Sequence, residues 1–147
     1  MTINTVIFNY GNNTEIINVT MKANTTTIAT ISNIDISRRN CTAITFQWDA
    51  ASFAYGYYTI SVSVAPVLGE DDTGDNTMVY GMIIITIPGD VNGDRTVDVL
   101  DRAGISAHWS GPPTGPLGYD ANFDINGDGR IDVLDRAIAS AHWGQHW

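Results

Sequence analysis

The sequence has a single cysteine, Cys41, and no long apolar run. One cysteine excludes an internal disulfide and any zinc site built from several cysteines. A membrane-spanning helix needs about 18 or more consecutive apolar residues, and the longest apolar stretch, residues 79–87, is interrupted by Gly81 and Thr86. The chain also shows no charged start followed by an apolar segment, so we expect a fragment of a longer protein, or a mature segment with a start codon added, rather than a chain with its own secretory signal.

Basic residues are scarce as well. Seven Lys and Arg stand against sixteen Asp and Glu, which gives a formal net charge of −9. Nucleic acid and anionic lipid both require a basic protein face, so we predict neither nucleic-acid binding nor membrane insertion. The hydrophobic fraction of 44% is sufficient for a folded core. The acidic balance fits cations as ligands.

No catalytic pattern is recognisable in the sequence. It contains neither a Gly-x-Ser-x-Gly turn nor a glycine-rich phosphate loop. Two of the three histidines, His108 and His142, stand in matching His-Trp pairs at the ends of predicted helices, where an imidazole typically bonds the last carbonyls. We therefore predict that this chain is not itself an enzyme.

The first 88 residues alternate between apolar and polar side chains. In the segment 15–22 the alternation places Ile17, Val19 and Met21 on one face, and segments 42–48 and 58–64 behave alike. Turn-forming residues separate these segments at 10–13, 38–40 and 69–76. Several short strands followed by predicted helices favour two domains, a β-sandwich over 1–88 and a small helical domain over 89–147.

The second region contains an internal duplication. Residues 90–109 and 124–143 are offset by 34 positions and agree at fourteen of twenty. Such a repeat predicts two units related by pseudo-symmetry. Each copy is an acidic loop followed by a helix, over 99–109 and 133–143, and the Gly- and Pro-rich segment 110–123 is predicted to be a loop.

Each acidic loop has oxygen-bearing side chains at positions one, three, five, nine and twelve, and position seven can add its backbone carbonyl. This is the spacing of an EF-hand calcium loop, and calcium prefers oxygen ligands. A solvated acidic loop with chance spacing is the alternative. We predict two calcium ions, with candidate ligands Asp90, Asn92, Asp94, Thr96, Asp98 and Asp101 in the first loop and Asp124, Asn126, Asp128, Arg130, Asp132 and Asp135 in the second.

Clustered carboxylates repel one another, so folding of this region should depend on the metal. Position six is Gly129 in the second loop but Arg95 in the first. If the backbone there has a positive φ, the arginine weakens the first site relative to the second. At position eight, we expect the backbone of Ile131 to pair with the other loop.

Two loop–helix copies, with no helix before either loop, resemble a dockerin over residues 88–147. The resemblance implies calcium-dependent docking onto a cohesin domain of another protein. It also implies partner-binding residues, namely Val99, Leu100, Ser106 and Ala107 in the first copy and Val133, Leu134, Ser140 and Ala141 in the second. Because the two sets are identical, docking in two orientations is expected. Alternatively, the Val-Leu pairs fill the core of the domain.

Residues 1–87 resemble a CARDB-type module, an immunoglobulin-like sandwich found in archaeal and bacterial surface proteins. Segments 9–12, 45–48, 56–60 and 69–76 carry this resemblance. It implies an extracellular role in adhesion or as a spacer. Four Asn-x-Thr sequons agree with a secreted glycoprotein, and their candidate glycosylation sites are Asn12, Asn18, Asn24 and Asn40.

The sequence thus favours a calcium-dependent, extracellular interaction module that docks onto a cohesin-like partner. Two alternatives remain open. The chain is a structural subunit of a cell-surface assembly or filament, with a neighbouring subunit as its partner, or it is the C-terminal anchoring region of a larger secreted enzyme.

Overall fold

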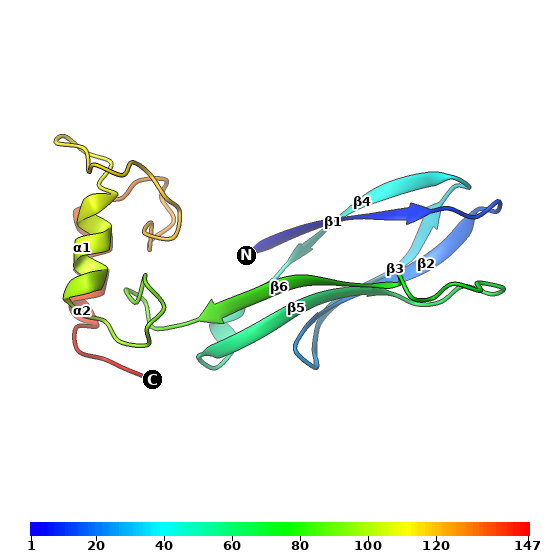
Figure 1. Ribbon diagram of the computed structural model, residues 1–147, viewed down its shortest axis with the longest axis horizontal. Coiled ribbons are helices and arrows are strands. Elements are labelled where there is room, and N and C mark those ends of the chain that lie inside the picture. Colours follow the sequence, from blue (N-terminus) through cyan, green and yellow to red (C-terminus); the bar gives the residue numbers. More distant parts are fainter. The chain divides into compact units, whose positions relative to one another are not determined.

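A computed structural model describes all residues, 1–147. The chain divides into two compact units, Met1–Ile83 and Ile84–Trp147. The first unit is built of strands, and the second carries two helices (Figure 1). Neither helix has the length and apolar character that a membrane crossing requires.

The β unit contains two antiparallel sheets. β1 and β4 form the smaller sheet, and the larger one has the order β3-β2-β5-β6. Figure 1 shows the β1–β4 pair lying over the larger sheet. The elements are β1 (Thr2–Asn9), β2 (Glu15–Ala23), β3 (Thr26–Ile36), β4 (Asn40–Gln47), the short 3₁₀ helix η1 (Ala50–Ser52), β5 (Gly56–Val64) and β6 (Thr77–Ile85).

Alternation along the strands decides which side chains are buried. Ile17, Val19 and Met21 of β2 are buried, as their period-two spacing predicts. In β4, Ile44 and Phe46 point into the core while their neighbours are exposed. The predicted turn segments 10–13 and 69–76 lie between strands, and the segment 38–40 ends on Asn40, the first residue of β4. The N-terminal region is therefore a β-rich fold, as the sequence predicts.

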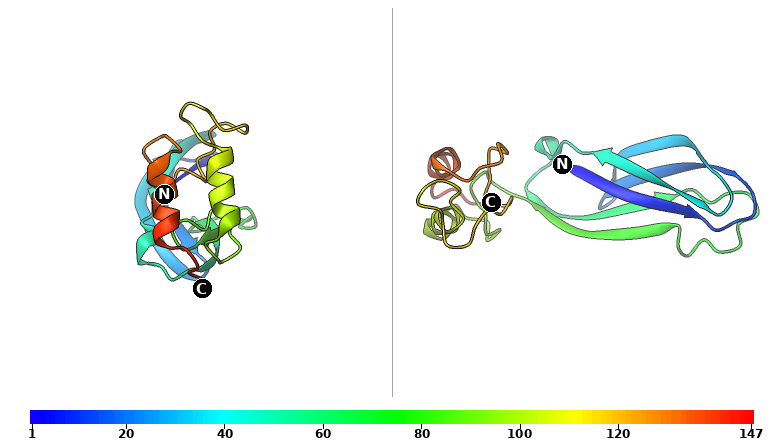
Figure 2. Two further views of the ribbon diagram at one scale, coloured as in Figure 1. Left: turned by 90° about the vertical axis from the view of Figure 1, so that its left-hand side faces the viewer. Right: turned by 90° about the horizontal axis from the view of Figure 1, so that it is seen from above.

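The second unit contains α1 (Val99–Ala107) and α2 (Val133–Ala141), which lie side by side and run in opposite directions (Figure 2). Each helix begins with a capping box made by the aspartates at loop positions nine and twelve. Both helices end two residues before Trp109 and Trp143, where the sequence predicts their ends. The backbone turns at His108 and His142, and each ring Nδ1 donates to a carbonyl oxygen of the last turn at 2.9 Å. The predicted histidine–carbonyl contacts are confirmed.

The core of the helical unit draws on both copies of the repeat. Val97 and Ile105 come from the first copy, and Ile131 and Ala139 from the second. Ile87, which follows β6, completes this buried cluster, and Phe123 and Trp147 pack against it. Because neither copy has a core of its own, the two loop–helix units fold as one body.

Candidate metal-binding loops and helix faces

Both acidic loops make the same backbone reversal. Residues at positions four and six have positive φ, with values of 74° for Gly93 and 79° for Arg95. The second loop repeats this with 71° for Gly127 and 85° for Gly129. The left-handed conformation costs a non-glycine residue about 1–2 kcal/mol. The Arg95 guanidinium carbon lies 5.3 Å from the ring centroid of Trp147, a cation–π contact that offsets part of this cost.

The carboxylate at position one of each loop accepts hydrogen bonds from the backbone of the same loop. Both oxygens of Asp90 and of Asp124 accept backbone N–H groups from positions four, five and six, and each also accepts a hydroxyl from outside the loop. Asp90 accepts from Gly93 (2.9 Å), Asp94 (3.1 Å), Arg95 (3.0 Å) and the Thr86 hydroxyl. Asp124 accepts from Gly127 (2.8 Å), Asp128 (3.2 Å), Gly129 (2.8 Å) and the Tyr119 hydroxyl (2.9 Å).

These hydrogen bonds favour the ionised form of Asp124. Desolvation is the largest single effect and acts to raise the pKa of Asp124. The hydrogen bonds from the Gly129 amide, the Tyr119 hydroxyl and the amides of Gly127 and Asp128 together outweigh it, so this pKa lies below its ordinary value. The same hydrogen bond to Asp124 raises the pKa of the Tyr119 phenol. The loop therefore keeps the charge that a cation requires.

The carboxylate at position twelve joins the start of each loop to its helix. Asp101 and Asp135 are fully buried. One oxygen of Asp101 accepts the amides of Val91 (2.9 Å) and Asn92 (3.2 Å), and the other accepts the amide of Asp98 (2.7 Å). Asp135 makes the equivalent three bonds in its own loop, at 2.8, 3.2 and 2.8 Å. A buried carboxylate is tolerated here because three N–H groups bind it.

The remaining candidate ligands form short local turns. The Asn92 oxygen accepts the amide of Asp94 at 2.8 Å, and its NH₂ group donates to a carboxylate oxygen of Asp94 at 3.0 Å. The other Asp94 oxygen accepts the amide of Thr96 at 2.9 Å. Asn126, Asp128 and Arg130 repeat this pattern. At position nine, Asp98 and Asp132 accept the amides of Leu100 and Leu134, which begins each helix.

The chemistry of these residues fits calcium, although the side chains are not gathered around a point. Each loop offers only oxygen donors at the five side-chain positions, four of them carboxylates. No three Asp, Glu, His or Cys side chains of the chain are close enough together to hold a metal ion. In this structure the carboxylates are turned toward backbone amides. The structure thus brings the candidate ligands onto one curled loop in each copy.

The loops do not pair with one another, contrary to our expectation for Ile131. Its carbonyl accepts the amide of Ser110 at 2.8 Å, and its amide donates to the Ser110 hydroxyl at 2.9 Å. At the matching position of the first loop, the Val97 carbonyl accepts the amide of Gly144, also at 2.8 Å. Each loop therefore pairs with the segment that follows the helix of the other copy. Ser110 and Gly144 are themselves offset by 34 residues, so the repeat in the sequence already indicates that they occupy equivalent positions.

The C-terminal tail closes the helical unit. The amide of Val97 donates to the Gln145 carbonyl at 3.0 Å, and the Trp147 amide donates to the Arg95 carbonyl at 3.2 Å. The Trp147 indole N–H donates to the Thr86 hydroxyl at 2.7 Å. That same hydroxyl contacts Asp90. The tail is thereby connected to the first carboxylate of the first loop, a link that no pattern in the sequence predicts.

The first residues of both helices present apolar side chains to solvent. Val99 and Val133 are each 63% exposed, Leu100 is 60% exposed and Leu134 is 53% exposed. The alternative that these pairs fill the core is wrong, because Val97, Ile105, Ile131 and Ala139 occupy it. Of the other candidate partner-binding residues, Ser106, Ser140 and Ala141 are exposed and Ala107 is half-buried.

The candidate glycosylation sites lie on the surface of the β unit. Asn12, Asn18, Asn24 and Asn40 are all exposed. Asn24 differs from the others because its side-chain NH₂ group donates a hydrogen bond to the Tyr57 carbonyl at 3.2 Å. This is the nitrogen to which a glycan would be attached. Asn24 is therefore the least available of the four in the folded chain.

One family model matches this sequence, that of the dockerin type I domain, over residues 88–141. The match spans both acidic loops and both helices. No curated protein and no solved structure matches the chain. Dockerin domains bind calcium and dock proteins onto one another, and they are typical of extracellular proteins. The β-rich residues preceding this match carry no such assignment.

Proposed function

We propose that the helical unit is a calcium-dependent docking module that binds a cohesin-like domain of another protein. One observation carries the proposal: next to each calcium-type loop, within a region matching the dockerin type I model, the helix begins with an exposed Val-Leu pair. Solvent-exposed apolar pairs at equivalent places of a duplicated domain are suited to bury against a partner. The module brings proteins together and performs no chemistry of its own.

Two calcium ions are part of this proposal, one for each loop. They would be held by Asp90, Asn92, Asp94, Asp98, Asp101 and the Thr96 carbonyl in the first loop and by Asp124, Asn126, Asp128, Asp132, Asp135 and the Arg130 carbonyl in the second. Calcium supplies positive charge among four carboxylates of each loop. The residues at positions nine and twelve already cap the helices, so they link metal binding to the presentation of the Val-Leu pairs.

The duplication further supports two docking orientations. Val99, Leu100, Ser106 and Ala107 recur unchanged, 34 residues later, as Val133, Leu134, Ser140 and Ala141. Because α1 and α2 run in opposite directions, turning the unit over exchanges one set for the other. We propose that the partner binds either set, with one occupied at a time.

The proposal places the protein outside the cell. An acidic chain with calcium loops suits an environment rich in that cation, and the surface sequons agree with it. The β unit, with its two facing sheets, serves in this proposal as an immunoglobulin-like spacer or adhesion module of the CARDB type. The docking module would then join it to a larger assembly.

A pair of matched charge substitutions tests the docking proposal. In the full chain, Leu100→Asp or Leu134→Asp alone should leave binding to a panel of cohesin domains within about twofold, since the other face remains. The double variant should lose at least a hundredfold in affinity, because a charge would be desolvated in either orientation. Isothermal titration in calcium and in EDTA measures both effects.

Leu117→Asp is the control, since Leu117 is 67% exposed but lies outside both helices. Helical circular dichroism verifies that each variant folds. Unchanged affinity of the double variant would refute the assigned surface. Sedimentation without a cohesin separates the assembly alternative, which requires calcium-dependent oligomers of this chain.

A further inference from the structure

A groove of about 700 Å³ runs along one side of the β unit. Every residue of β1 from Thr5 to Asn9, and Tyr10 after it, lines this groove. Neighbouring residues of a strand point to opposite faces, so a groove that touches all of them lies against the backbone edge of β1. Its inner wall includes Ile17, Ile36 and Val62 of the core.

The outer edge of β1 has no strand beside it, because β1 and β4 form a two-stranded sheet. Met1 and Trp48 exchange two backbone bonds of 2.9 Å, and such pairs alternate along an antiparallel ladder. Ile3, Thr5 and Ile7 therefore bond to β4, whereas Asn4, Val6 and Phe8 direct their N–H and C=O groups away from β4. Of these three residues, Val6 and Phe8 line the groove. The Asn4 carbonyl agrees with this, because it accepts the hydroxyl of Tyr80 at 3.3 Å from the other side.

β6 is the outer strand of the larger sheet, and its residue Met78 lines the groove. Its side chains are apolar yet exposed, with values of 57% for Met78, 52% for Tyr80 and 67% for Met82. On β1, Val6 is 52% exposed and Phe8 55%. Soluble proteins usually protect edge strands with charge or coverage, and an uncovered apolar edge favours addition of a strand.

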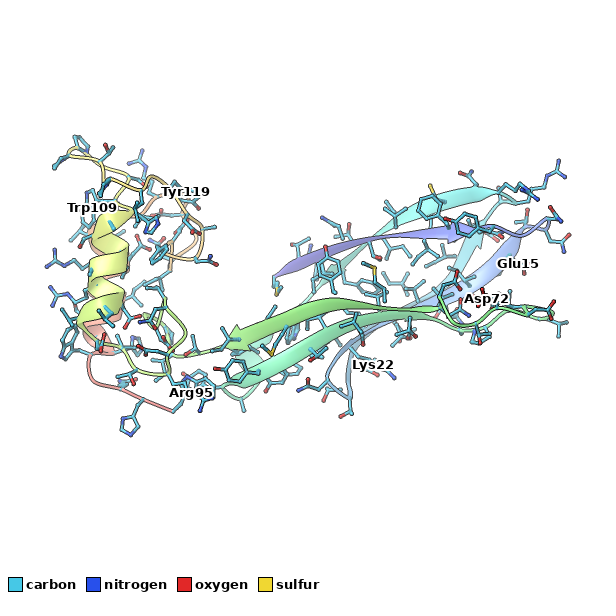
Figure 3. The ribbon with its side chains drawn as sticks, in the orientation of Figure 1. Glu15, Lys22, Asp72, Arg95, Trp109 and Tyr119 are labelled. Carbon is cyan, nitrogen blue, oxygen red and sulfur yellow. The ribbon has the colours of Figure 1, made fainter.

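The charge along the groove indicates what kind of segment would bind there. Glu15, Glu70, Asp72 and Asp75 line it, and no Lys, Arg or His does. Figure 3 shows Glu15 and Asp72 at the same end of the unit, with Lys22 toward the other end of β2. Arg39 does not line the groove, but its guanidinium donates to Asn12, which does, at 2.9 Å. An occupant with Lys or Arg complements these acids, whereas a second copy of the β unit, with seven acidic and three basic residues, would be repelled.

We propose that this groove binds an extended peptide segment of a partner protein, which adds as a strand to the open edge of β1. Its side chains alternate between apolar and polar, and it carries a Lys or Arg beside the acidic loop between β5 and β6. Backbone hydrogen bonds to Val6 and Phe8 provide the pairing, and the core-side wall receives the apolar side chains. A segment opposite residues 5–10 spans six residues, about 20 Å.

The probe for this site is a blocked heptapeptide, Lys-Val-Thr-Val-Thr-Val-Lys, added to the full-length chain. Amide hydrogen exchange should slow at least tenfold at Val6 and Phe8, with no change at Val19 in the core. Because the groove lies in the β unit, the effect should persist in EDTA, so its outcome does not depend on calcium-dependent docking. Unchanged exchange at Val6 and Phe8 at millimolar peptide would overturn the proposal.

Two matched proline variants locate the binding edge. Val6→Pro removes an outward N–H without removing a bond to β4, so it should abolish the peptide effect at Phe8. Thr2→Pro also removes an outward N–H, but beyond the groove, and should retain that effect. The peptide with Glu in place of both Lys should bind at least tenfold more weakly. Equal binding of both peptides would refute the charge argument, and protection at Val6 through self-association would identify a second copy as the occupant.

Discussion

At the scale of single residues, the two loops differ most at position six. Arg95 and Gly129 share a left-handed backbone, and only glycine adopts it without steric cost. Arg95 receives partial compensation from Trp147, whose ring lies beneath the guanidinium. This contact is worth about 0.5–1 kcal/mol at an exposed site, less than or comparable to the backbone cost. We therefore retain the prediction that the first loop binds calcium more weakly.

Arg95→Gly should strengthen calcium binding at the first loop by up to about fivefold, which corresponds to about 1 kcal/mol of relieved strain. Calcium titration followed through the amide resonances of each loop separates the two sites. The second loop should keep its affinity, which serves as the internal control. A first site that already binds more tightly than the second in the unmodified chain would contradict the strain argument.

Gly129→Ala should produce the reverse effect at the second loop. No atom lies within 4 Å of the added Cβ and φ is 85°, so the substitution introduces backbone strain without a clash. We expect about 1 kcal/mol of lost stability and a calcium affinity reduced about fivefold. Gly118→Ala is the matched control, since Gly118 has φ of 75°, equal free space and a place outside both loops. It should lose similar stability and keep the calcium affinity.

At the scale of elements, the sequence predicted what local spacing determines. The alternation of Ile17, Val19 and Met21 identified a buried strand face, and the repeated carboxylates identified both helix starts. It predicted the wrong partner for Ile131, because the pairing with Ser110 joins segments 21 residues apart and no local pattern marks it. The only sign of this pairing in the sequence is the 34-residue offset between Ser110 and Gly144. The sequence predicts helix ends at Trp109 and Trp143, two residues too late, because the backbone leaves the helical conformation at His108 and His142.

The contacts of Trp147 in the C-terminal tail lead to a prediction at this scale. Trp147→Ala should destabilise the helical unit by about 2 kcal/mol, because it removes packing against the core and the indole hydrogen bond to Thr86. Trp143→Ala is the matched control, since its side chain is 49% exposed and lies 5.3 Å from the Arg102 guanidinium. That variant should lose less than about 1 kcal/mol. Thermal unfolding in calcium, followed by helical circular dichroism, compares the stability of the two variants. Equal losses would contradict the proposed stabilising role of Trp147.

At the scale of the whole molecule, the distribution of the acids matters more than the net charge. Nine of the sixteen acidic residues lie between Asp90 and Asp135, and eight of those nine are candidate ligands. The β unit has its own core, with Phe46, Met21 and Ile60 among its fully buried side chains, and it contains none of these loops. Calcium should therefore control the folding of one unit and leave the other unaffected.

The shared core of the helical unit makes that control cooperative across both copies. Asp124→Ala with Asp128→Ala removes two candidate ligands from the second loop alone, yet α1 packs on Ile131 and Ala139 of the second copy. We therefore expect the double variant to lose the helical signal of both α1 and α2 in calcium, as EDTA should do for the unmodified chain, while the β signal persists. Asp71→Ala with Asp75→Ala makes the same charge change in the β unit and should retain both helices. Amide exchange at Ile105 reports whether α1 survives in the loop variant. Continued protection of this amide would show that each copy folds alone, because only an independent core protects it once the second copy is unfolded.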